Sequence, residues 1–545
     1  MKQFVYKSCG CSFDIIKEQK IPNIYFNLDI SKINLDCRRT WQILSDGNTK
    51  GCFQLESRLG QSLAKRLKPS NIEELAALVS IMRPGCLEAF RESKSVTNHY
   101  IDKKNGKEAV DYFHPALKDI LNKTYGEMIY QEQAMQIAQK IAGFDLQQAD
   151  MLRKAIGKKK PEEMAKLKEK FISGAKKLNI VSNSEATELF NWIEKSQRYS
   201  FNKSHAVSYA FNAFLSAYAK SHFPKVFFLS YLMFAKDKIN PQREIRELVN
   251  NAKEMGISVM LPDLRLMNEN FLLHEQKICF GLTNIKGFGL SVYKKLKKII
   301  DDNNFDIPNI KFPELYIKIL RHMNSSAVKN MITAGGLDYM KYSRNYMIAC
   351  LNCLSVFTSK EYSNILNNEC LIGLESTEDL LSKVLESPTG RGQMLSSSKR
   401  HKAISDALKI LQNPPYTLID SPEWIADNEY AILGVALTCS KIDGCDHLGA
   451  NITCSEFKNT LLKTISIASE IIDVKITKTK KGKNPGSEMA FVTISDSTGS
   501  VDSVILFPEA FSEFKDLIEP GNTVVISGNK NKEGDSLIVK KIWQV

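Results

Sequence analysis

The chain has 545 residues, which at roughly 100–200 residues per domain predicts several domains. Its 43% apolar and 25% charged residues are ordinary for a globular protein and exclude a disordered chain, collagen and a coiled-coil rod. The formal net charge of +13 fits a polyanionic partner without identifying one.

The sequence also indicates where the protein works. No stretch reaches the roughly 18 continuous apolar residues of a membrane span, and the N-terminus has no apolar signal core. The 12 cysteines scatter without a framework spacing. We therefore expect reduced thiols in a cytoplasmic protein with no membrane partner.

The first half of the chain is predicted to be mostly helical. Residues 1–40 form an N-terminal extension of uncertain structure, in which 23–37 suggest one or two short strands. Within 41–234, the segment 129–143 places apolar residues at helical spacing and ends at a glycine. The segment 206–221 is so apolar that its helix must be buried.

The second half is expected to change character twice. Short helices with Pro and Gly breaks are predicted over 235–345, followed by a polar, mixed region over 346–462 with a linker at 387–400. Residues 463–545 alternate apolar and polar side chains between turn signals, which is typical of a small barrel such as an OB-fold. The predicted fold is a multidomain, mostly α-helical body with a C-terminal β-barrel.

A basic segment stands out in the first half. Residues 151–177 hold ten Lys or Arg against three Glu, and GKKKP places three ammonium groups ahead of Pro161, which suits the start of a new helix. Such a cluster can bind a triphosphate or a DNA backbone through charge-assisted contacts. Its residue types are equally typical of a solvated helix face.

The segment FNKSHAVSYA, residues 201–210, places a cation, an imidazole and a phenol close together. Lys203 can hold a phosphate, and His205 or Tyr209 can pack against a sugar or base; a structural histidine is the alternative. Arg83 precedes Pro84-Gly85 in an extended turn, from which a guanidinium can project. The amides of Gln131 and Gln133 fit a binding role and a polar helix face equally well.

Four segments, in this order along the chain, resemble the fingers of the alpha subunit of bacterial DNA polymerase III, a C-family replicative polymerase. They are GCFQLES with IMRPG (51–57 and 81–85), TYGEMIYQEQAMQIAQ (124–139), ADMLRKAIGKKKPEEM (149–164) and FNKSHAVSYA (201–210). The resemblance runs from about Cys37 to about Met340 and resumes more weakly over the barrel region. It implies that 41–234 bind the incoming nucleotide through Arg83, Arg153, Lys159, Lys203, His205 and Tyr209, with Lys158 and Lys160 on DNA phosphates.

Two further segments are expected to contact DNA. LTNIKGFGLSVYKKLKK, residues 282–298, has the Gly-apolar-Gly pattern of a helix-hairpin-helix element, which the family also carries. There the backbone N–H groups of Gly287 and Gly289 suit a DNA phosphate, and Lys294 follows on a basic helix. In the barrel region, Lys478 and Lys481 lie in a basic strand and its turn. Phe491 and Phe507 are candidates either for stacking on a single strand or for the core.

The resemblance also implies what lies outside this sequence. In the family, an Asp-x-Asp pair and a third Asp of the palm hold two metal ions, and no such pair precedes the fingers here; Asp29 and Asp36 do not match it. We therefore expect no catalytic residue and no metal in this chain, with Mg²⁺ bound by a palm-bearing partner. Cys9 and Cys11 can begin a metal site with Cys37 or Cys52, but C-x-C falls short of zinc spacing. Cys350 and Cys353 are interpreted as buried thiols.

The functional hypothesis is half of a split replicative DNA polymerase. Its partners would be a palm-bearing subunit, primer-template DNA, deoxynucleoside triphosphates and a sliding clamp, for which Gln393-Met394-Leu395 is the candidate peptide, although it lacks an aromatic end. The alternatives are a non-catalytic DNA-binding accessory protein and a truncated or artificial chain. We expect the isolated chain to bind DNA in a salt-sensitive way without extending a primer.

Overall fold

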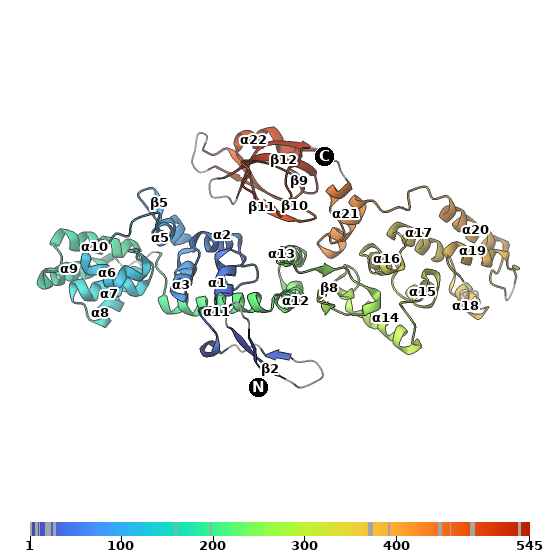
Figure 1. The fold of residues 1–545 in the computed structure, drawn as a ribbon, viewed down its shortest axis with the longest axis horizontal. Helices are drawn as coiled ribbons and strands as arrows, with labels where there is room; N and C mark the ends of the chain where they lie inside the picture. The colour runs from blue at the N-terminus through green and yellow to red at the C-terminus, as the bar shows by residue number, and fades with distance from the viewer. Residues whose placement is uncertain are drawn as a thin grey trace. The chain divides into compact units, whose positions relative to one another are not determined.

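The structure is a computed structural model of the 545-residue chain. It describes residues 3–5, 9, 11–16, 23–25, 29–157, 161–196, 199–368, 374–390, 393–444, 449–457, 459–479, 485–531 and 536–545. The chain folds into two compact units, Met1–Phe227 and Phe228–Val545 (Figure 1). None of the helices in these described ranges combines the length and the apolar character that a membrane crossing requires.

The first core of the N-terminal unit forms around a long buried helix, α11 (Lys203–His222), which packs on α3 (Ile72–Ile81). The predicted helix over 206–221 is thereby confirmed. Its buried face carries Ala206, Ala210, Ala213 and Ala217, and such small side chains let two helices approach closely. The same core is completed by α1 (Arg38–Ser45), α2 (Arg58–Leu67), α4 (Pro84–Glu88) and α5 (Val96–Lys104).

Short strands accompany these helices. The segments β1 (Gln3–Val5), β2 (Ser12–Ile16) and β3 (Asn23–Tyr25) form an antiparallel sheet in the order β1-β2-β3. A two-stranded ribbon, β4 (Phe90–Arg91) and β5 (Lys94–Ser95), precedes α5.

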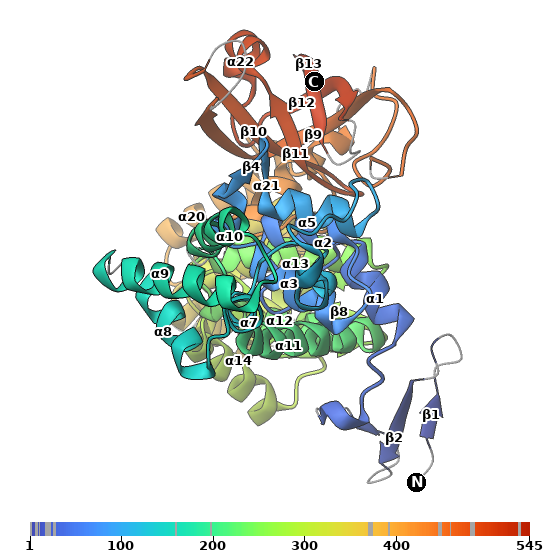
Figure 2. The same cartoon turned by 90° about the vertical axis from the view of Figure 1, so that its left-hand side faces the viewer.

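The second core of this unit belongs to a group of helices that both ribbon views show together (Figure 1, Figure 2). They are α6 (Lys118–Leu121), α7 (Gln131–Ala142), α8 (Leu146–Gly157), α9 (Pro161–Leu178) and α10 (Asn183–Ser196). The helix predicted at 129–143 is confirmed: Gly143 ends α7 with φ 67°, a conformation that glycine adopts at little cost. Pro161 begins α9, where a proline loses no helical hydrogen bond.

The C-terminal unit opens with helices around a small sheet. After α12 (Pro224–Phe234), which spans the unit boundary, come α13 (Pro241–Glu254) and the strands β6 (Val259–Met260), β7 (Leu272–His274) and β8 (Lys277–Cys279). Three helices follow: α14 (Leu290–Asn303), α15 (Phe312–Lys318) and α16 (Ser325–Thr333).

The region 346–462, which we predicted to be mixed, contains well-defined helices. They are α17 (Arg344–Leu354), α18 (Ser359–Asn367), α19 (Thr377–Glu386), α20 (Ser398–Gln412) and α21 (Pro422–Leu433). Side-chain caps begin several of them: Thr358 accepts from the Glu361 amide and Ser376 from the Asp379 amide. Cys350 and Cys353 are buried in α17, as predicted for structural thiols.

The chain ends in a closed five-stranded barrel. Its strands are β9 (Thr464–Lys478), β10 (Glu488–Asp496), β11 (Gly499–Leu506), β12 (Thr523–Lys530) and β13 (Leu537–Gln544), joined in the order β10-β11-β13-β12-β9 with β9 also paired to β10. The helix α22 (Pro508–Phe514) lies between β11 and β12 in sequence. The predicted β-barrel is confirmed, and this order is that of an OB-fold.

One glycine is required for the barrel to close. A Cβ on Gly528 would lie 2.1 Å from the Ile538 carbonyl oxygen, at an irregularity in the pairing of β12 with β13.

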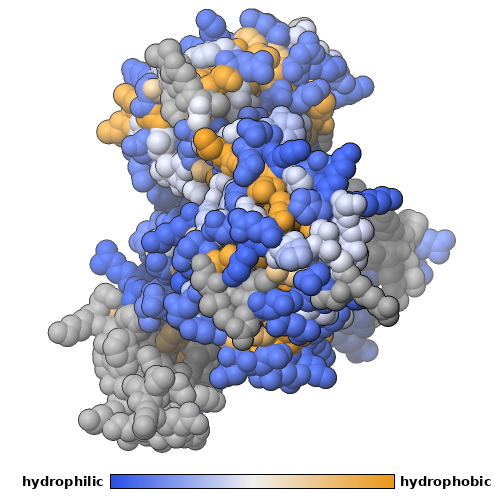
Figure 3. Space-filling model, turned by 90° about the vertical axis from the view of Figure 1, so that its right-hand side faces the viewer, coloured by the Kyte–Doolittle hydropathy of each residue, from blue (hydrophilic) through white to orange (hydrophobic). Residues whose placement is uncertain are grey.

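On the face shown in Figure 3, the described surface is mainly hydrophilic, and apolar side chains gather in small groups.

Candidate functional site

Two of the singled-out segments, 124–139 and 201–210, are joined directly by backbone hydrogen bonds. The Phe201 amide donates to the Ile129 carbonyl at 2.9 Å, and the Gln131 amide donates to the Phe201 carbonyl at 3.0 Å. Tyr130 and Phe201 are thus partners in an isolated parallel bridge. The start of α7 is fixed against the start of α11, although 70 residues separate them in sequence.

A carboxylate secures this junction. Glu132 accepts a hydrogen bond from the Asn202 side chain at 2.7 Å and another from the Lys203 amide at 2.9 Å. Asn202 in turn caps α11 by accepting from the His205 amide at 2.9 Å. A negative charge at the positive end of a helix dipole stabilises that helix, so Glu132 holds the first turn of α11 in place.

The two glutamines of this segment have structural hydrogen bonds. The side-chain oxygen of Gln133 accepts from the amides of Ile129 and Tyr130, each at 3.0 Å, and its amide group donates to the Thr124 hydroxyl at 2.7 Å. Gln133 is buried, and it therefore supports the backbone before α7. Gln131 donates weakly to the Ser200 carbonyl at 3.4 Å.

A continuous series of rings lies along the first turns of α11, and we call it the aromatic row: Phe201, His205, Tyr209 and Phe53. The ring centroids of Phe201 and His205 are 5.2 Å apart, those of His205 and Tyr209 are 4.0 Å apart, and those of Tyr209 and Phe53 are 5.1 Å apart. His205 and Tyr209 are four residues apart, which places them on one side of α11, and Phe201 lies just before that helix. His205 is exposed and Phe53 is 38% exposed, so the row is open to a planar ligand.

Arg83 completes one end of the row. Its guanidinium carbon lies 3.5 Å from the centroid of the Phe201 ring, in a cation–π contact. Arg83 has an extended backbone, φ −78° and ψ 149°, ahead of Pro84 at the start of α4, as the sequence predicted. The structure therefore brings Arg83, His205 and Tyr209 together.

Lys203 lies beside the same bridge but on another side of α11. Its ammonium nitrogen is 5.6 Å from the centroid of the Tyr130 ring and 3.3 Å from a carboxylate oxygen of Glu73. Each bridge partner thus carries a cation over its ring: Lys203 over Tyr130 and Arg83 over Phe201. Two cations held close to the start of α11 suit the phosphates of a nucleotide.

The remaining predicted nucleotide residues have other surroundings. Arg153 lies on α8 and pairs with Asp150 at 2.9 Å. Asp150 also pairs with Lys154, at 2.7 Å. The structure shows Arg153 in this local pair and in no contact with the aromatic row among the described residues. Lys158, Lys159 and Lys160 lie outside the described residues.

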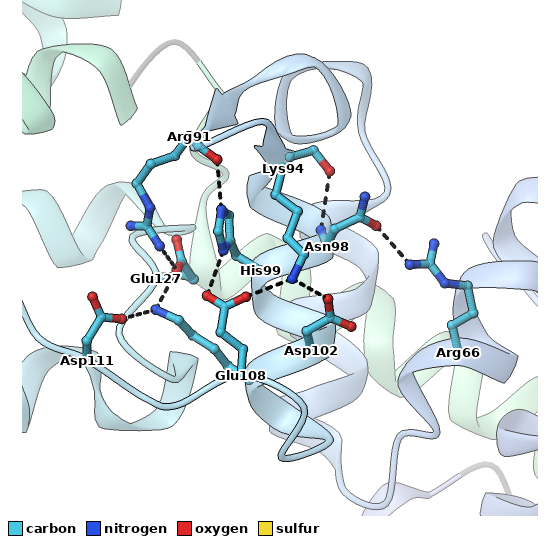
Figure 4. Close-up of polar contacts among 11 residues, drawn as sticks. Arg66, Arg91, Lys94, Asn98, His99, Asp102, Glu108, Asp111 and Glu127 are labelled. Carbon is cyan, nitrogen blue, oxygen red and sulfur yellow. Dashed lines mark hydrogen bonds and ion pairs between the residues drawn. The ribbon is translucent and has the colours of Figure 1, made fainter. Parts of the chain in front are cut away.

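A network of charged side chains surrounds α5 in the same unit (Figure 4). Glu127 accepts from Arg91 at 2.8 Å and from the buried Lys103 at 3.0 Å, and Lys103 also contacts Asp111. Lys94 bridges Asp102 at 2.7 Å and Glu108 at 3.0 Å. Because cations and carboxylates are paired within it, this network leaves little free charge for a ligand and ties β4, β5 and α5 together.

His99 is the buried centre of this network. Its Nδ1 is 2.7 Å from a carboxylate oxygen of Glu108 and its Nε2 is 3.0 Å from the Arg91 carbonyl oxygen. These two contacts, one on each ring nitrogen, fix the orientation of the imidazole. Burial raises the pKa of Glu108, but hydrogen bonds from His99 and Lys94 outweigh this effect and lower it overall.

In the C-terminal unit, the hairpin predicted over 282–298 is formed. Gly287 has φ 81°, a conformation that favours glycine, and the Asn330 side chain donates to the Lys286 carbonyl at 2.7 Å behind it. Gly289 begins α14 without a side-chain cap, and a Cβ there would meet nothing within 4 Å. The uncapped amides and this open approach suit a phosphate. Beyond them, α14 exposes Lys294, Lys295, Lys297 and Lys298.

The barrel presents an aromatic ring on its outer surface. Phe491 on β10 is 38% exposed and pairs across the ladder with Lys475 on β9. Its chain neighbours Ala490 and Val492 are buried, so Phe491 points outward from the core. Phe507 is 47% exposed, and Lys478 is exposed at the end of β9, whereas Lys481 lies outside the described residues.

The candidate clamp peptide is part of the fold. Leu395 is fully buried, and its carbonyl oxygen accepts from the Gly390 amide at 3.0 Å. The Gln393 carbonyl oxygen accepts from the Asn364 side chain at 2.7 Å. Gln393-Met394-Leu395 is therefore anchored at both ends.

The expected Mg²⁺ ions find no ligands among the described residues. Mg²⁺ prefers carboxylate oxygens, and in the described ranges no three carboxylates converge on one point. The described residues thus do not fit this ion.

Sequence reasoning missed Phe53, Phe201, Glu73 and Glu132. The recurrence of rings every four residues at 201, 205 and 209 was a signal for the row. The pairing of Glu73 with Lys203, and of Glu132 with the start of α11, depends on separate helices and had no local signal.

Comparison with known proteins places these features in a family. Residues 11–179 match the bacterial DNA polymerase III alpha subunit finger domain, and residues 256–347 match a helix-hairpin-helix motif. The DNA polymerase III subunit alpha of Aquifex aeolicus is 30% identical over 539 residues, which are 97% of this chain and 40% of that protein. The subunit of Chlamydia trachomatis is 29% identical over 95% of this chain and 39% of its own length, and that of Vibrio cholerae is 31% identical over 92% and 40%.

The chain spans about 40% of the length of these curated relatives. The matched finger domain includes Phe53 and Arg83, and the matched hairpin motif includes Gly287 and Gly289. The predicted resemblance is confirmed: over almost its whole length this chain is related to part of the alpha subunit of bacterial DNA polymerase III, with the finger domain of that family at residues 11–179.

Proposed function

We propose that this chain supplies the fingers, the helix-hairpin-helix and the OB barrel of a C-family replicative DNA polymerase. In this role it binds the incoming deoxynucleoside triphosphate and the primer-template DNA. The observation that carries the proposal is the pair of cations over the bridged rings of Tyr130 and Phe201, in segments that resemble the polymerase fingers. The metal-binding aspartates would belong to a palm on a separate chain, which holds Mg²⁺ and performs nucleotidyl transfer.

The aromatic row suits the base and sugar of the nucleotide. His205 and Tyr209 offer flat surfaces in contact with one another, and the His205 ring is exposed. A flat imidazole beside the sugar can exclude a 2′-hydroxyl by its bulk. Arg83 at the end of the row would interact with a phosphate while remaining stacked on Phe201.

Lys203 would hold a phosphate by exchanging partners. In the structure, Lys203 is paired with Glu73. A triphosphate carries about four negative charges and offers a stronger partner than one half-exposed carboxylate. Arg153 and Lys159 would add charge to this site, with Lys158 and Lys160 holding template or primer phosphates.

DNA would be held by the C-terminal unit. The uncapped start of α14 at Gly287 and Gly289 would bind one backbone phosphate, and Lys294 would add a charged contact. The barrel would contact single-stranded DNA through Phe491 and the basic strand that ends at Lys478, and Lys481, which lies outside the described residues, would add a further cation. A sliding clamp remains a further partner of the proposal, although the buried Leu395 argues for another docking peptide.

The test compares the purified chain alone with the chain co-purified with a palm-bearing C-family chain from the same source. Alone, it should bind a fluorescent primer-template with strong salt dependence and should not extend the primer in Mg²⁺. Together, the two chains should extend it. DNA binding without any effect of the palm chain or of nucleotide would instead identify a non-catalytic accessory protein.

Extension by this chain alone, after removal of every other polymerase, would contradict the split arrangement. Failure to bind DNA at low salt would contradict the proposal as a whole.

A further inference from the structure

Four groups that bind soft metals converge at the end of α11 opposite the aromatic row. Cys9 and Cys11 come from the N-terminal segment, Cys37 lies just before α1, and His222 is the last residue of α11. One ligand atom from each lies within 4.8 Å of all the others. The sequence provided only C-x-C, which is short of zinc spacing, and the fourth group lies 185 residues from Cys37.

The spacing of these atoms fits a tetrahedral zinc ion. With Zn–S bonds of about 2.3 Å and a Zn–N bond of about 2.05 Å, a regular tetrahedron has S···S edges of about 3.8 Å and S···N edges of about 3.6 Å. Cys37 Sγ and His222 Nε2 are 3.3 Å apart, close to the second value. The outer limit of 4.8 Å is only slightly wider than the first value, so small side-chain rotations would complete the coordination.

The surroundings resemble those of a closed structural site. Cys11, Cys37 and His222 are each at most 3% exposed, and the Tyr218 ring covers the imidazole at 4.5 Å. Four protein ligands leave no open position, as in structural rather than catalytic zinc sites. Sulfur and imidazole donors select Zn²⁺ over Mg²⁺ or Ca²⁺.

The charges around the cluster suit bound thiolates. Three thiolates and Zn²⁺ carry a net charge of −1, which the positive end of α1 and the nearby Arg39 would offset. Cys37 is the N-cap of α1 and makes no side-chain capping hydrogen bond, so its sulfur can act as a ligand. Arg39 is fixed beside His222, because its guanidinium donates to the Ser221 carbonyl at 2.9 Å.

Other contacts hold the ligands in place. The Asn34 side chain donates to the Cys9 carbonyl at 3.4 Å and approaches Cys11 Sγ at 3.8 Å. Such outer contacts orient metal ligands.

We propose that Cys9, Cys11, Cys37 and His222 bind one Zn²⁺ in a structural site that fastens the N-terminal segment and α1 to the C-terminal end of α11. The ion would hold one end of a helix of 20 residues whose other end carries the aromatic row. It stabilises the N-terminal unit, and this role is independent of nucleotide or DNA binding.

The test measures metal in the purified full chain under reducing conditions. Elemental analysis should find one zinc per chain, and removal of the metal followed by Co²⁺ should produce the thiolate-to-cobalt charge-transfer absorption of a tetrahedral site. Cys37→Ser should lower the bound zinc several-fold. Cys52→Ser, which alters another fully buried cysteine of the same core, should leave the zinc content unchanged.

If Cys37→Ser does not fold, the zinc content and the cobalt spectrum of the wild-type protein provide the test. The proposal is overturned if the purified wild-type chain contains no zinc and also does not develop the cobalt absorption. A disulfide between any two of Cys9, Cys11 and Cys37 in protein isolated from the reducing cytoplasm overturns it as well. The variant His222→Cys should still bind one zinc, and its cobalt-substituted form should have a spectrum different from that of the wild-type protein. An unchanged spectrum would show that His222 is not a ligand.

Discussion

The variant Lys203→Ala tests whether Lys203 binds a nucleotide phosphate or only stabilises the fold. The Lys203–Glu73 pair is 3.3 Å long, and its side chains are 36% and 42% exposed. Exposed pairs of this kind contribute about 0–1 kcal/mol, and an exposed cation–π contact about 0.5–1 kcal/mol. Lys203→Ala should therefore lower the free energy of unfolding by no more than about 1–2 kcal/mol.

The expected effect on nucleotide use is larger. A lost charged hydrogen bond to a phosphate costs about 1.5–3 kcal/mol, which corresponds to roughly a 10- to 150-fold loss in kcat/KM for the incoming nucleotide. The loss should fall mainly on nucleotide use, with DNA affinity largely retained. Single-nucleotide incorporation by the complex with a palm-bearing chain measures it, and fluorescent nucleotide binding to this chain measures the binding component.

Two variants serve as controls. Glu73→Gln keeps the size of the side chain but removes the competing carboxylate, so nucleotide binding should be equal to or tighter than that of wild type. Lys195→Ala removes an exposed lysine on α10 and should change neither stability nor nucleotide use. A Lys203→Ala complex that incorporates nucleotide like wild type would refute the phosphate assignment. A loss of several kcal/mol in stability would show that Lys203 is structural.

Further outcomes follow from the other sites. His205→Ala should relax discrimination against ribonucleotides, measured as the ratio of kcat/KM for the two sugars, and an unchanged ratio would remove His205 from the sugar contact. Lys294→Ala should weaken primer-template binding and lower its salt slope by about 1, as fluorescence anisotropy across a salt series would show; Lys360→Ala on α18 is the matched control. Stability should fall in acid, because Glu108 and Asp111 have lowered pKa values in the fold: hydrogen bonds from His99 and Lys94 outweigh burial at Glu108, and the Lys103 hydrogen bond lowers that of Asp111. A carboxylate whose pKa is lower in the folded than in the unfolded protein stabilises the fold at any pH above its unfolded pKa. This contribution is lost as the pH falls through the folded pKa, so the midpoint temperature of unfolding should decrease below about pH 4.5. Glu108→Gln should make this decrease smaller.

Local patterns in the sequence were sufficient for most of the secondary structure. The apolar spacing of 129–143 and the alanine-rich stretch of 206–221 predicted α7 and α11, and the alternation after 463 predicted the barrel. These features depend on helical and strand periodicities, which a sequence displays directly. The same reasoning left 346–462 as a mixed region, whereas the structure has the separate helices α17–α21 there.

The candidate sites show the same division. The residue types available for binding, and through four motifs in order the related family, follow from the sequence. The folded chain was needed to see that Arg83 stacks on Phe201, that Lys203 pairs with Glu73, and that Gln133 supports the backbone. It also brought His222 to Cys37 across 185 residues. The spacing of apolar residues predicts which side of a helix or strand is buried. Contacts between distant segments depend instead on the path that the chain follows between them.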